Sequence, residues 1–307
     1  MKAKVSGTKK KINGTTFLLM ITILLFVVMY AAGMIVFNDK GFAKPQMFLN
    51  LFISNAGLLV IAMGETIVMI TAGIDISVGS VTALVCMVAA NQMENHGASA
   101  YTALLMALVI GLLFGLVQGF LVSYLEIQPF IVTLAGMFFA RGMTTIVHTD
   151  PFNVQNKAFV ALKDTRVIVP GMGSVNRIGK YVDAYVEIGV IVALLIVVLM
   201  FVMLRWSKLG RAFYAVGGNK QSALMLGINV KRTRFLAQLF SGVLAGIAGY
   251  VYFLHVGSGS ASHATGMEMN AIASSIIGGT LLTGGVGNII GTFFGVLSLS
   301  TIQNIVS

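Results

Sequence analysis

Apolar residues run along this chain in long blocks separated by short polar segments. The blocks lie near 17–37, 47–71, 76–93, 100–125, 130–148, 184–204, 235–256, 269–283 and 286–306. Most blocks match the roughly 20 residues that a helix needs to cross a bilayer, and two of them are short. The pattern predicts an all-α polytopic membrane bundle of about nine spans, with two broken or short helices, in a single domain over residues 1–307.

Charged residues are scarce and lie mainly between the blocks. Hydrophobic residues make up 57% of the chain and charged residues 10%, with a net charge of +10. The basic residues flank apolar spans and do not alternate with aromatics, so nucleic acid is not an expected partner. Residues 1–16 and 205–234 are basic without an acid, which predicts that both are cytoplasmic. Counting spans from a cytoplasmic N-terminus agrees, and it makes 149–183 a periplasmic segment.

The 205–234 loop contains the signals of a short capped helix. Asn219 is a favourable N-cap because its side chain can accept a hydrogen bond from a first-turn N–H group. Gly227 can adopt the left-handed conformation that ends a helix. We predict about seven helical residues between them, a rod of roughly 10 Å. A loop that only joined two spans would need no such rod, so this one is a candidate contact for a cytoplasmic partner.

Two segments of ten residues, 71–80 and 283–292, interrupt apolar stretches and align without gaps. They share a first threonine, two glycine positions, a β-branched residue and a terminal hydroxyl. Irregular backbone at membrane depth persists only where protein or a watery cavity satisfies it, so matched breaks indicate a transport pathway. Two tight turns between glycine-rich helices are the alternative. The residues expected to make the breaks are Gly73, Asp75, Gly79, Gly284, Gly285 and Gly287.

Four separated motifs carry a family resemblance. They are Ala-Gly-Ile-Asp-Ile-Ser-Val-Gly-Ser at 72–80, Pro-Phe-Ile-Val-Thr-Leu-Ala-Gly-Met-Phe-Phe-Ala-Arg-Gly at 129–142, Gly-Arg-Ala-Phe-Tyr-Ala-Val-Gly-Gly-Asn at 210–219 and Ala-Ile-Ala-Ser-Ser-Ile-Ile-Gly-Gly-Thr-Leu-Leu-Thr-Gly-Gly-Val-Gly at 271–287. With them, nearly the whole chain resembles the permease subunits of bacterial ribose- and galactose-type monosaccharide importers driven by ATP. The 129–142 motif is most similar to the galactofuranose-uptake branch. Such permeases usually continue with a further apolar helix, so we expect a tenth span to be missing after Ser307.

The resemblance implies a function and a set of partners. It implies a path for a monosaccharide across the bacterial inner membrane, a second permease that is either a copy or a sister chain, a periplasmic sugar-binding protein, and a cytoplasmic ATP-binding subunit. The positions that match the coupling helix of such importers are Gly217, Gly218, Asn219, Ala223, Leu226 and Gly227. Leu224 and Leu226 would fill a groove on the ATPase, and the surrounding cations would meet acidic partner surface or membrane lipid headgroups.

Polar residues inside the apolar blocks are candidates for the path. A charge at the bilayer centre costs about 2.5–3.5 kcal/mol on insertion scales, so Glu65 and Arg141 need a partner or a wet cavity. They either form a structural ion pair or grip sugar hydroxyls, and the pair is favoured because a long-lived grip would oppose release. Asp75 is placed to cap the span that follows it, in preference to contacting substrate.

Weaker path candidates are two amides and two aromatic rings. Asn55 and Gln118 could offer exchangeable hydrogen bonds to hydroxyls, although such amides more often bond across helices. Phe138 or Phe139 could form an apolar platform for a sugar ring. Glycines also recur every four residues at 111, 115 and 119 and at 287, 291 and 295. This spacing predicts tight helix packing or a seam between two permeases.

The sequence offers little for catalysis. Its four histidines lack metal-ligand spacing, Cys86 is the single cysteine, and no nucleophile-elbow or P-loop motif is present. We therefore expect no enzyme activity, no metal and no cofactor, with ATP hydrolysis on a separate subunit. Two alternative transport functions stay open: a permease for branched-chain amino acids or another small solute, and a secondary transporter driven by an ion gradient.

Overall fold

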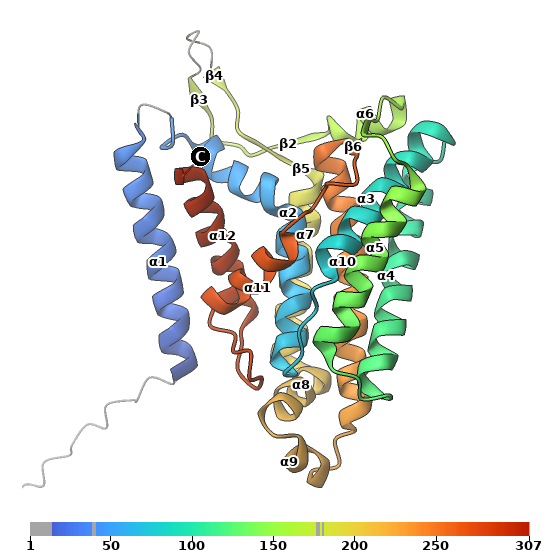
Figure 1. Cartoon of the computed structure of the whole chain (residues 1–307). Coiled ribbons are helices and arrows are strands. Elements are labelled where there is room, and N and C mark those ends of the chain that lie inside the picture. Colours follow the sequence, from blue (N-terminus) through green and yellow to red (C-terminus); the bar gives the residue numbers. More distant parts are fainter. Residues whose placement is uncertain (1–13, 39–40, 176–178, 180, 307) are drawn as a thin grey trace, which may run out of the picture.

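The computed structural model describes residues 14–38, 41–175, 179 and 181–306, and these residues form a bundle of helices (Figure 1). The predicted cytoplasmic tail at 1–16 lies almost wholly outside the described residues. The helices are α1 (Gly14–Val36), α2 (Pro45–Ile70), α3 (Val78–Asn95), α4 (Ala100–Ser123), α5 (Pro129–Val147), α6 (Lys157–Lys163), α7 (Ile188–Trp206), α8 (Lys208–Gly218), α9 (Lys220–Met225), α10 (Val230–Val256), α11 (Met267–Ile277) and α12 (Ile289–Val306).

Every predicted apolar block coincides with a helix of the bundle. Within the described residues, seven helices are long and apolar enough to cross a membrane, namely α1, α2, α4, α5, α7, α10 and α12. The other two blocks correspond to α3, which has 18 residues, and to α11, which has only 11. The polytopic all-α bundle is therefore confirmed, and two of its nine apolar helices do not by themselves have the length and hydropathy of a span.

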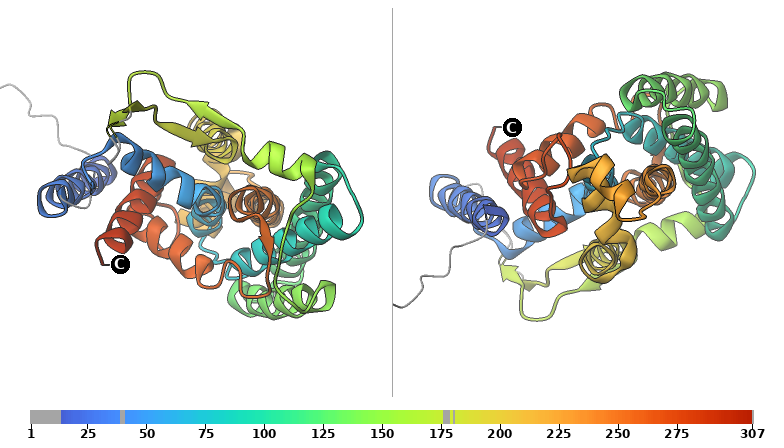
Figure 2. Two further views of the ribbon diagram at one scale, coloured as in Figure 1. Left: turned by 90° about the horizontal axis from the view of Figure 1, so that it is seen from above. Right: turned by 90° about the horizontal axis from the view of Figure 1, so that it is seen from below.

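Helix α2 forms the centre of the bundle. It contacts α7, α10, α11 and α12, and all of its residues from Leu51 to Ile70 except Ser54 are buried. Leu59, Ile61 and Met63 on this helix are fully buried. Helix α1 lies at one edge of the bundle, while α4 and α5 lie at the opposite edge (Figure 2).

The two series of glycines spaced four residues apart lie where helices of the bundle cross closely. On α4, a Cβ at Gly111 would lie 2.9 Å from the Cα of Gly246 on α10, and one at Gly115 would lie 3.0 Å from the Cα of Leu239. Gly295 on α12 meets Ser274 on α11 in the same way. The predicted tight packing is confirmed, and the alternative of a seam between two permeases at these glycines is wrong.

Short strands form a cap on one face of the bundle, opposite α8 and α9 (Figures 1 and 2). Three antiparallel pairs join β1 (Phe152–Asn153) to β6 (Ser258–Gly259), β2 (Arg166–Ile168) to β5 (Tyr185–Glu187), and β3 (Ser174–Val175) to β4 (Tyr181–Val182). The predicted extramembrane segment 149–183 carries most of this cap. The β1–β6 pair ties it to the loop between α10 and α11.

Candidate translocation and coupling site

The capped rod in the 205–234 segment is helix α9. The side-chain oxygen of Asn219 accepts a hydrogen bond of 2.9 Å from the N–H of Ser222, as an N-cap does. Gly227 has a φ of 76°, and its N–H donates to the carbonyl of Leu224. Both predicted caps are therefore present, around a helix of six residues.

The end of α9 presents apolar side chains to the outside. Leu224 is 58% exposed, Met225 88% and Leu226 76%, while Ala223 is buried and fixes the rod to the rest of the segment. Three consecutive exposed apolar side chains on a protruding tip are typical of a protein contact, because isolated domains seldom leave such patches uncovered.

The surface beside α9 is strongly basic. A pocket of about 740 Å³ between α9 and the end of α4 is lined by Lys220, Lys231 and Arg234 with one acid, Glu126. A 2.9 Å hydrogen bond from Lys231 holds the pKa of Glu126 below its ordinary value, and the charge of Arg234 lowers the pKa of Lys220. Cations therefore outnumber acids three to one around the tip.

A second helix in this segment, α8, was not predicted. Gly210, Gly217 and Gly218 lower its helix propensity, and they hid a pattern of apolar residues at helical spacing. Phe213 and Val216 on α8 are fully buried. The 205–234 segment is therefore two helices in series, and α8 connects the exposed rod to the interior of the bundle.

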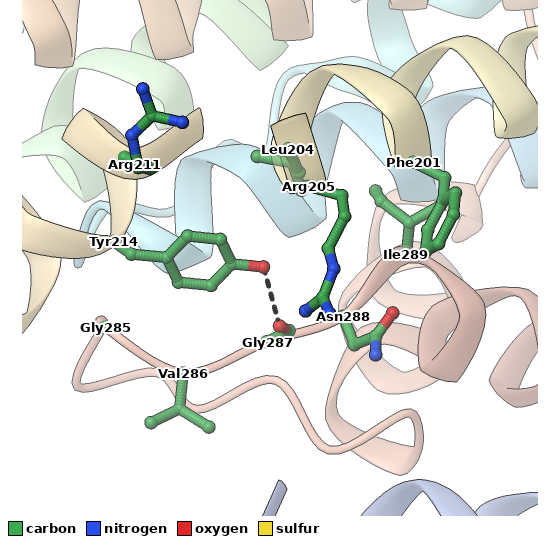
Figure 3. A pocket seen from close by; sticks show the side chains of 10 residues that line it. All are labelled: Phe201, Leu204, Arg205, Arg211, Tyr214, Gly285, Val286, Gly287, Asn288 and Ile289. Atoms are coloured by element: carbon green, nitrogen blue, oxygen red, sulfur yellow. Dashed lines mark hydrogen bonds between the residues drawn. The ribbon is translucent and has the colours of Figure 1, made fainter. Parts of the chain in front are cut away.

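Helix α8 ends against both helix breaks. The N–H of Gly285, in the second break, donates a 2.9 Å hydrogen bond to the carbonyl of Ile70, at the end of α2. Gly217 lies against both of these groups, and a Cβ there would overlap the Ile70 carbonyl and lie 2.6 Å from the Gly285 nitrogen. The hydroxyl of Tyr214 donates to the carbonyl of Gly287 at 2.9 Å (Figure 3). Three backbone segments distant in sequence therefore meet at one point.

The two aligned breaks also resemble each other in backbone conformation. Ala72 has a φ of 58°, and the aligned Gly284 has a φ of 85°. A Cβ on Gly284 would lie 2.7 Å from the Cβ of Ala72, so the two positions are in direct contact. Gly73 and Gly285 follow them, and only Gly285 has a positive φ, of 74°. The internal repeat inferred from the aligned residues therefore extends to the left-handed residue that turns each break.

The other glycines predicted to make the breaks allow neighbouring side chains to approach the backbone closely. A Cβ at Gly73 would lie 3.0 Å from Val68, and one at Gly287 would lie 2.8 Å from Ile70. At Gly79, in the first turn of α3, a Cβ would overlap the buried carboxylate of Glu268 on α11.

Asp75 is the centre of a buried polar network, not the N-cap of the following helix. The residue at the N-cap of α3 is Ser77. One carboxylate oxygen of Asp75 accepts from the hydroxyl of Ser77 at 2.7 Å, and the other accepts from Gln238 and Ser241 of α10, each at 2.8 Å. Gln118 of α4 joins through Ser77 and Gln238. The network ties the first break to α4 and α10, so the predicted cap is corrected.

The favoured ion pair between Glu65 and Arg141 is not formed. Glu65 is fully buried on α2, and one of its carboxylate oxygens accepts from the N–H of Asp75 at 3.3 Å. The guanidinium of Arg141 on α5 instead donates to the backbone carbonyls of Ala261 at 3.0 Å and His263 at 2.8 Å. Arg141 is thus held by carbonyls of the loop between α10 and α11, and the second carboxylate oxygen of Glu65 has no hydrogen-bond partner among the described residues.

Arg141 thereby holds the wall of a polar pocket. The loop that it contacts, between α10 and α11, bounds a pocket of about 270 Å³ together with α2 and the start of α11. Polar side chains predominate in its lining, which includes Asn55, His263, Thr265 and Asn270. Asn55 donates to the hydroxyl of Ser300 at 2.7 Å, and Asn270 has no side-chain hydrogen bond within the part of the chain described. The pocket can offer donors and acceptors to a hydroxylated solute.

The other path candidates lie elsewhere. Gln118 belongs to the buried network around Asp75, while Phe138 and Phe139 are 66% and 63% exposed on α5. Of the predicted path residues, Asn55 lines the polar pocket, Arg141 contacts only the loop that bounds it, and neither ring lines it. Five contributors were missed by sequence reasoning: Tyr214, Gln238, Ser241, His263 and Glu268. Polar residues within apolar blocks were a usable signal for Gln238 and Ser241.

The apolar bundle, the paired breaks and the exposed rod together define a multi-pass membrane transport subunit. Residues 47–307 match the family described as the permease component of the branched-chain amino acid transport system. The chain belongs to this family. No solved structure shows a significant match to it.

Several curated permeases are similar over most of their length. The fructose import permease protein FruG of Bifidobacterium longum is 34% identical over 99% of this chain and 88% of its own length. The inner membrane ABC transporter permease protein YjfF of Escherichia coli is 37% identical over 94% and 83%. The D-allose transport system permease protein AlsC of Escherichia coli is 32% identical over 95% and 82%. These relatives are transport permeases and not enzymes.

Proposed function

We propose that this chain is the membrane-spanning permease subunit of an ATP-driven importer and forms the path of a monosaccharide delivered by a periplasmic binding protein. The observation that carries the proposal is the contact of α8 with both helix breaks at Gly217. A push on the exposed α9 would reach, through α8, the two places where the bundle backbone is broken. Two of the relatives described above are named for fructose and D-allose, which supports a sugar as the solute.

The orientation of the chain follows from its charge. We infer that α8 and α9 lie in the cytoplasm, together with the N-terminus, because both segments are basic and contain no acid. The first turn of α1 lies on the same side of the bundle as α8 and α9 (Figure 1). The strand-bearing cap over 149–183 is then periplasmic, where the binding protein would dock.

The polar pocket is our candidate for the first sugar contact inside the chain. Asn55, His263 and Asn270 supply amide and imidazole groups that suit vicinal hydroxyls, and Arg141 holds the loop that carries His263. On the cap side of the bundle, β1 of the cap pairs with β6 at the start of that loop. Within the sugar class we favour the galactofuranose branch, on the resemblance of the 129–142 motif.

We infer three protein partners. An ATP-binding subunit would receive the α9 tip, a second permease, either a copy or a sister chain, would complete the path, and a binding protein would dock on the cap. Glu65 and the network around Asp75 then act as a buried anchor of the first break, in contact with neither solute nor partner.

Co-purification with the ATPase subunit tests the coupling role. We expect Leu226→Asp to abolish retention of the ATPase, because the substitution places a charge in the middle of the apolar tip. Val175→Asp is the matched control, since Val175 is 56% exposed on the opposite cap. The proposal fails if Leu226→Asp inserts normally and still retains the ATPase, or if vesicles take up sugar on a proton or sodium gradient without ATP.

Binding-protein-dependent uptake tests the pocket separately. Asn270→Leu removes a polar group from the lining and should lower sugar uptake at least about tenfold, the effect of about 1.4 kcal/mol. Retention of the ATPase should stay unchanged, which distinguishes a path defect from an assembly defect. Unchanged uptake in this variant would remove the pocket from the path.

A further inference from the structure

A second pocket lies on the face of the bundle that carries α8 and α9. It has a volume of about 530 Å³ and is enclosed by the end of α7, by α8 and by residues 285–289 of the second break (Figure 3). Arg205 and Arg211 lie on two of its sides, and Tyr214 reaches across it to Gly287. None of the roles proposed above uses this pocket.

The pocket has positive charge and no counter-charge. Both of its charged lining residues are arginines, and none of the described acidic residues lines it. The ion pairs found in the described part of the chain join Lys231 to Glu126 and His255 to Glu187, so neither Arg205 nor Arg211 has an acidic partner there. Arg211 donates to the carbonyl of Trp206, which leaves most of its five N–H donors available. An anion bound in the pocket would therefore lie near two unpaired positive charges.

One wall of the same pocket is apolar. Phe201 and Leu204 on α7 and Ile289 on α12 line it, and all three belong to helices of membrane-spanning length. Trp206, next to Arg205, is 64% exposed, as are tryptophans that lie at a bilayer interface. Leu204 and Ile289 are buried and Phe201 is partly exposed, so the pocket combines guanidinium groups with an apolar wall carried by membrane-spanning helices. That combination fits an amphiphile better than a small soluble anion.

We propose that this pocket binds an anionic phospholipid, with its phosphate near Arg205 and Arg211 and an acyl chain along the partly exposed Phe201. Arginine forks match phosphate oxygens, and anionic headgroups are concentrated at the inner leaflet. The bound lipid bridges α7 and α8 to the second break, the same connection that the Tyr214 hydrogen bond makes. Binding therefore stiffens the contact through which α8 acts on that break.

Thermal unfolding of the purified permease chain in zwitterionic detergent tests the proposal without any partner subunit. Added phosphatidylglycerol should raise the unfolding midpoint, whereas phosphatidylcholine, glycerol phosphate and inorganic phosphate should not. Arg205→Gln should weaken the phosphatidylglycerol effect at least about tenfold in midpoint concentration. The matched control is Lys208→Gln, which removes one exposed cation of α8 that does not line the pocket.

Three outcomes would overturn the lipid site. An equal loss in Lys208→Gln would mean diffuse attraction to the basic face. Stabilisation by inorganic phosphate equal to that by the lipid would mean a soluble anion. Loss of ATPase retention in Arg205→Gln, with lipid stabilisation intact, would mean that the arginines bind an acidic partner surface. Since the thermal unfolding measurement uses the permease alone, a negative result in it would leave the importer proposal untouched.

Discussion

The two helix breaks have a similar turn but are held by different forces. In the first, between α2 and α3, the Asp75 carboxylate accepts hydrogen bonds from side chains of the break and of α10. In the second, between α11 and α12, backbone contacts predominate, including the Gly285 bond to Ile70. No residue of 71–77 is exposed, whereas Leu281 and Leu282 are 45% and 53% exposed.

This difference indicates which break can move. A network of charge-assisted hydrogen bonds in a buried site is costly to separate, because every donor would lose its partner in a medium without water. The second break has fewer such ties, and Tyr214 of α8 donates a hydrogen bond to it at Gly287, whereas Gly217 lies against both breaks. We infer that the first break is the fixed reference and that the second moves against it when α8 is displaced.

Gly217→Ala should have the largest effect, because it acts where α8 meets both breaks. The new methyl would overlap the Ile70 carbonyl, and backbone cannot move aside as a flexible side chain can. We expect a loss of about 3 kcal/mol or more of stability, seen as a lower unfolding midpoint and loss of transport. Gly218→Ala is the matched control, since its Cβ would meet nothing within 4 Å. Equal losses of stability in the two variants would contradict the inference that Gly217 is the point where α8 meets both breaks.

Asp75→Ala should come next, because it removes the acceptor that holds the first break. The side chains of Ser77, Gln238 and Ser241 would lose an acceptor while still buried, at an expected cost of about 2.5 kcal/mol. Asp75→Asn retains one oxygen and should cost about 1 kcal/mol, again from unfolding midpoints. A first break that tolerated alanine as well as asparagine would not be held by this network.

Effects smaller than that of Asp75→Ala should come from exchanging glycine and alanine at the paired left-handed positions 72 and 284. Gly284→Ala adds a positive-φ penalty and a contact with Ala72, so we expect about 2 kcal/mol of destabilisation. Ala72→Gly removes the strain of a positive φ, which stabilises the folded protein, but it also raises the conformational entropy of the unfolded chain. These two contributions to the free energy of unfolding should cancel within about 0.5 kcal/mol. Unfolding measurements on both variants check this asymmetry. Symmetric losses would mean that the breaks respond alike.

Features governed by neighbouring residues could be read from the sequence. The nine apolar blocks gave the helices, because membrane-spanning length depends on local hydropathy. Asn219 and Gly227 marked the ends of α9 because caps act within one helical turn. Helix α8 was missed because three glycines masked a pattern that only its burial against α2 and α10 makes stable.

Partner choice among distant polar residues was decided by the tertiary structure alone. The sequence offered Arg141 an ion pair with Glu65 or a place on the sugar path, and the structure instead gives it the carbonyls of Ala261 and His263 as partners. Asp75 was expected to cap α3, but Ser77 holds the N-cap position and α10 gives the second oxygen of Asp75 two donors. A sequence fixes which groups must be satisfied and how helices begin and end. Which group satisfies which depends on helix crossings, because hydrogen bonds and close glycine contacts form only within a few ångströms.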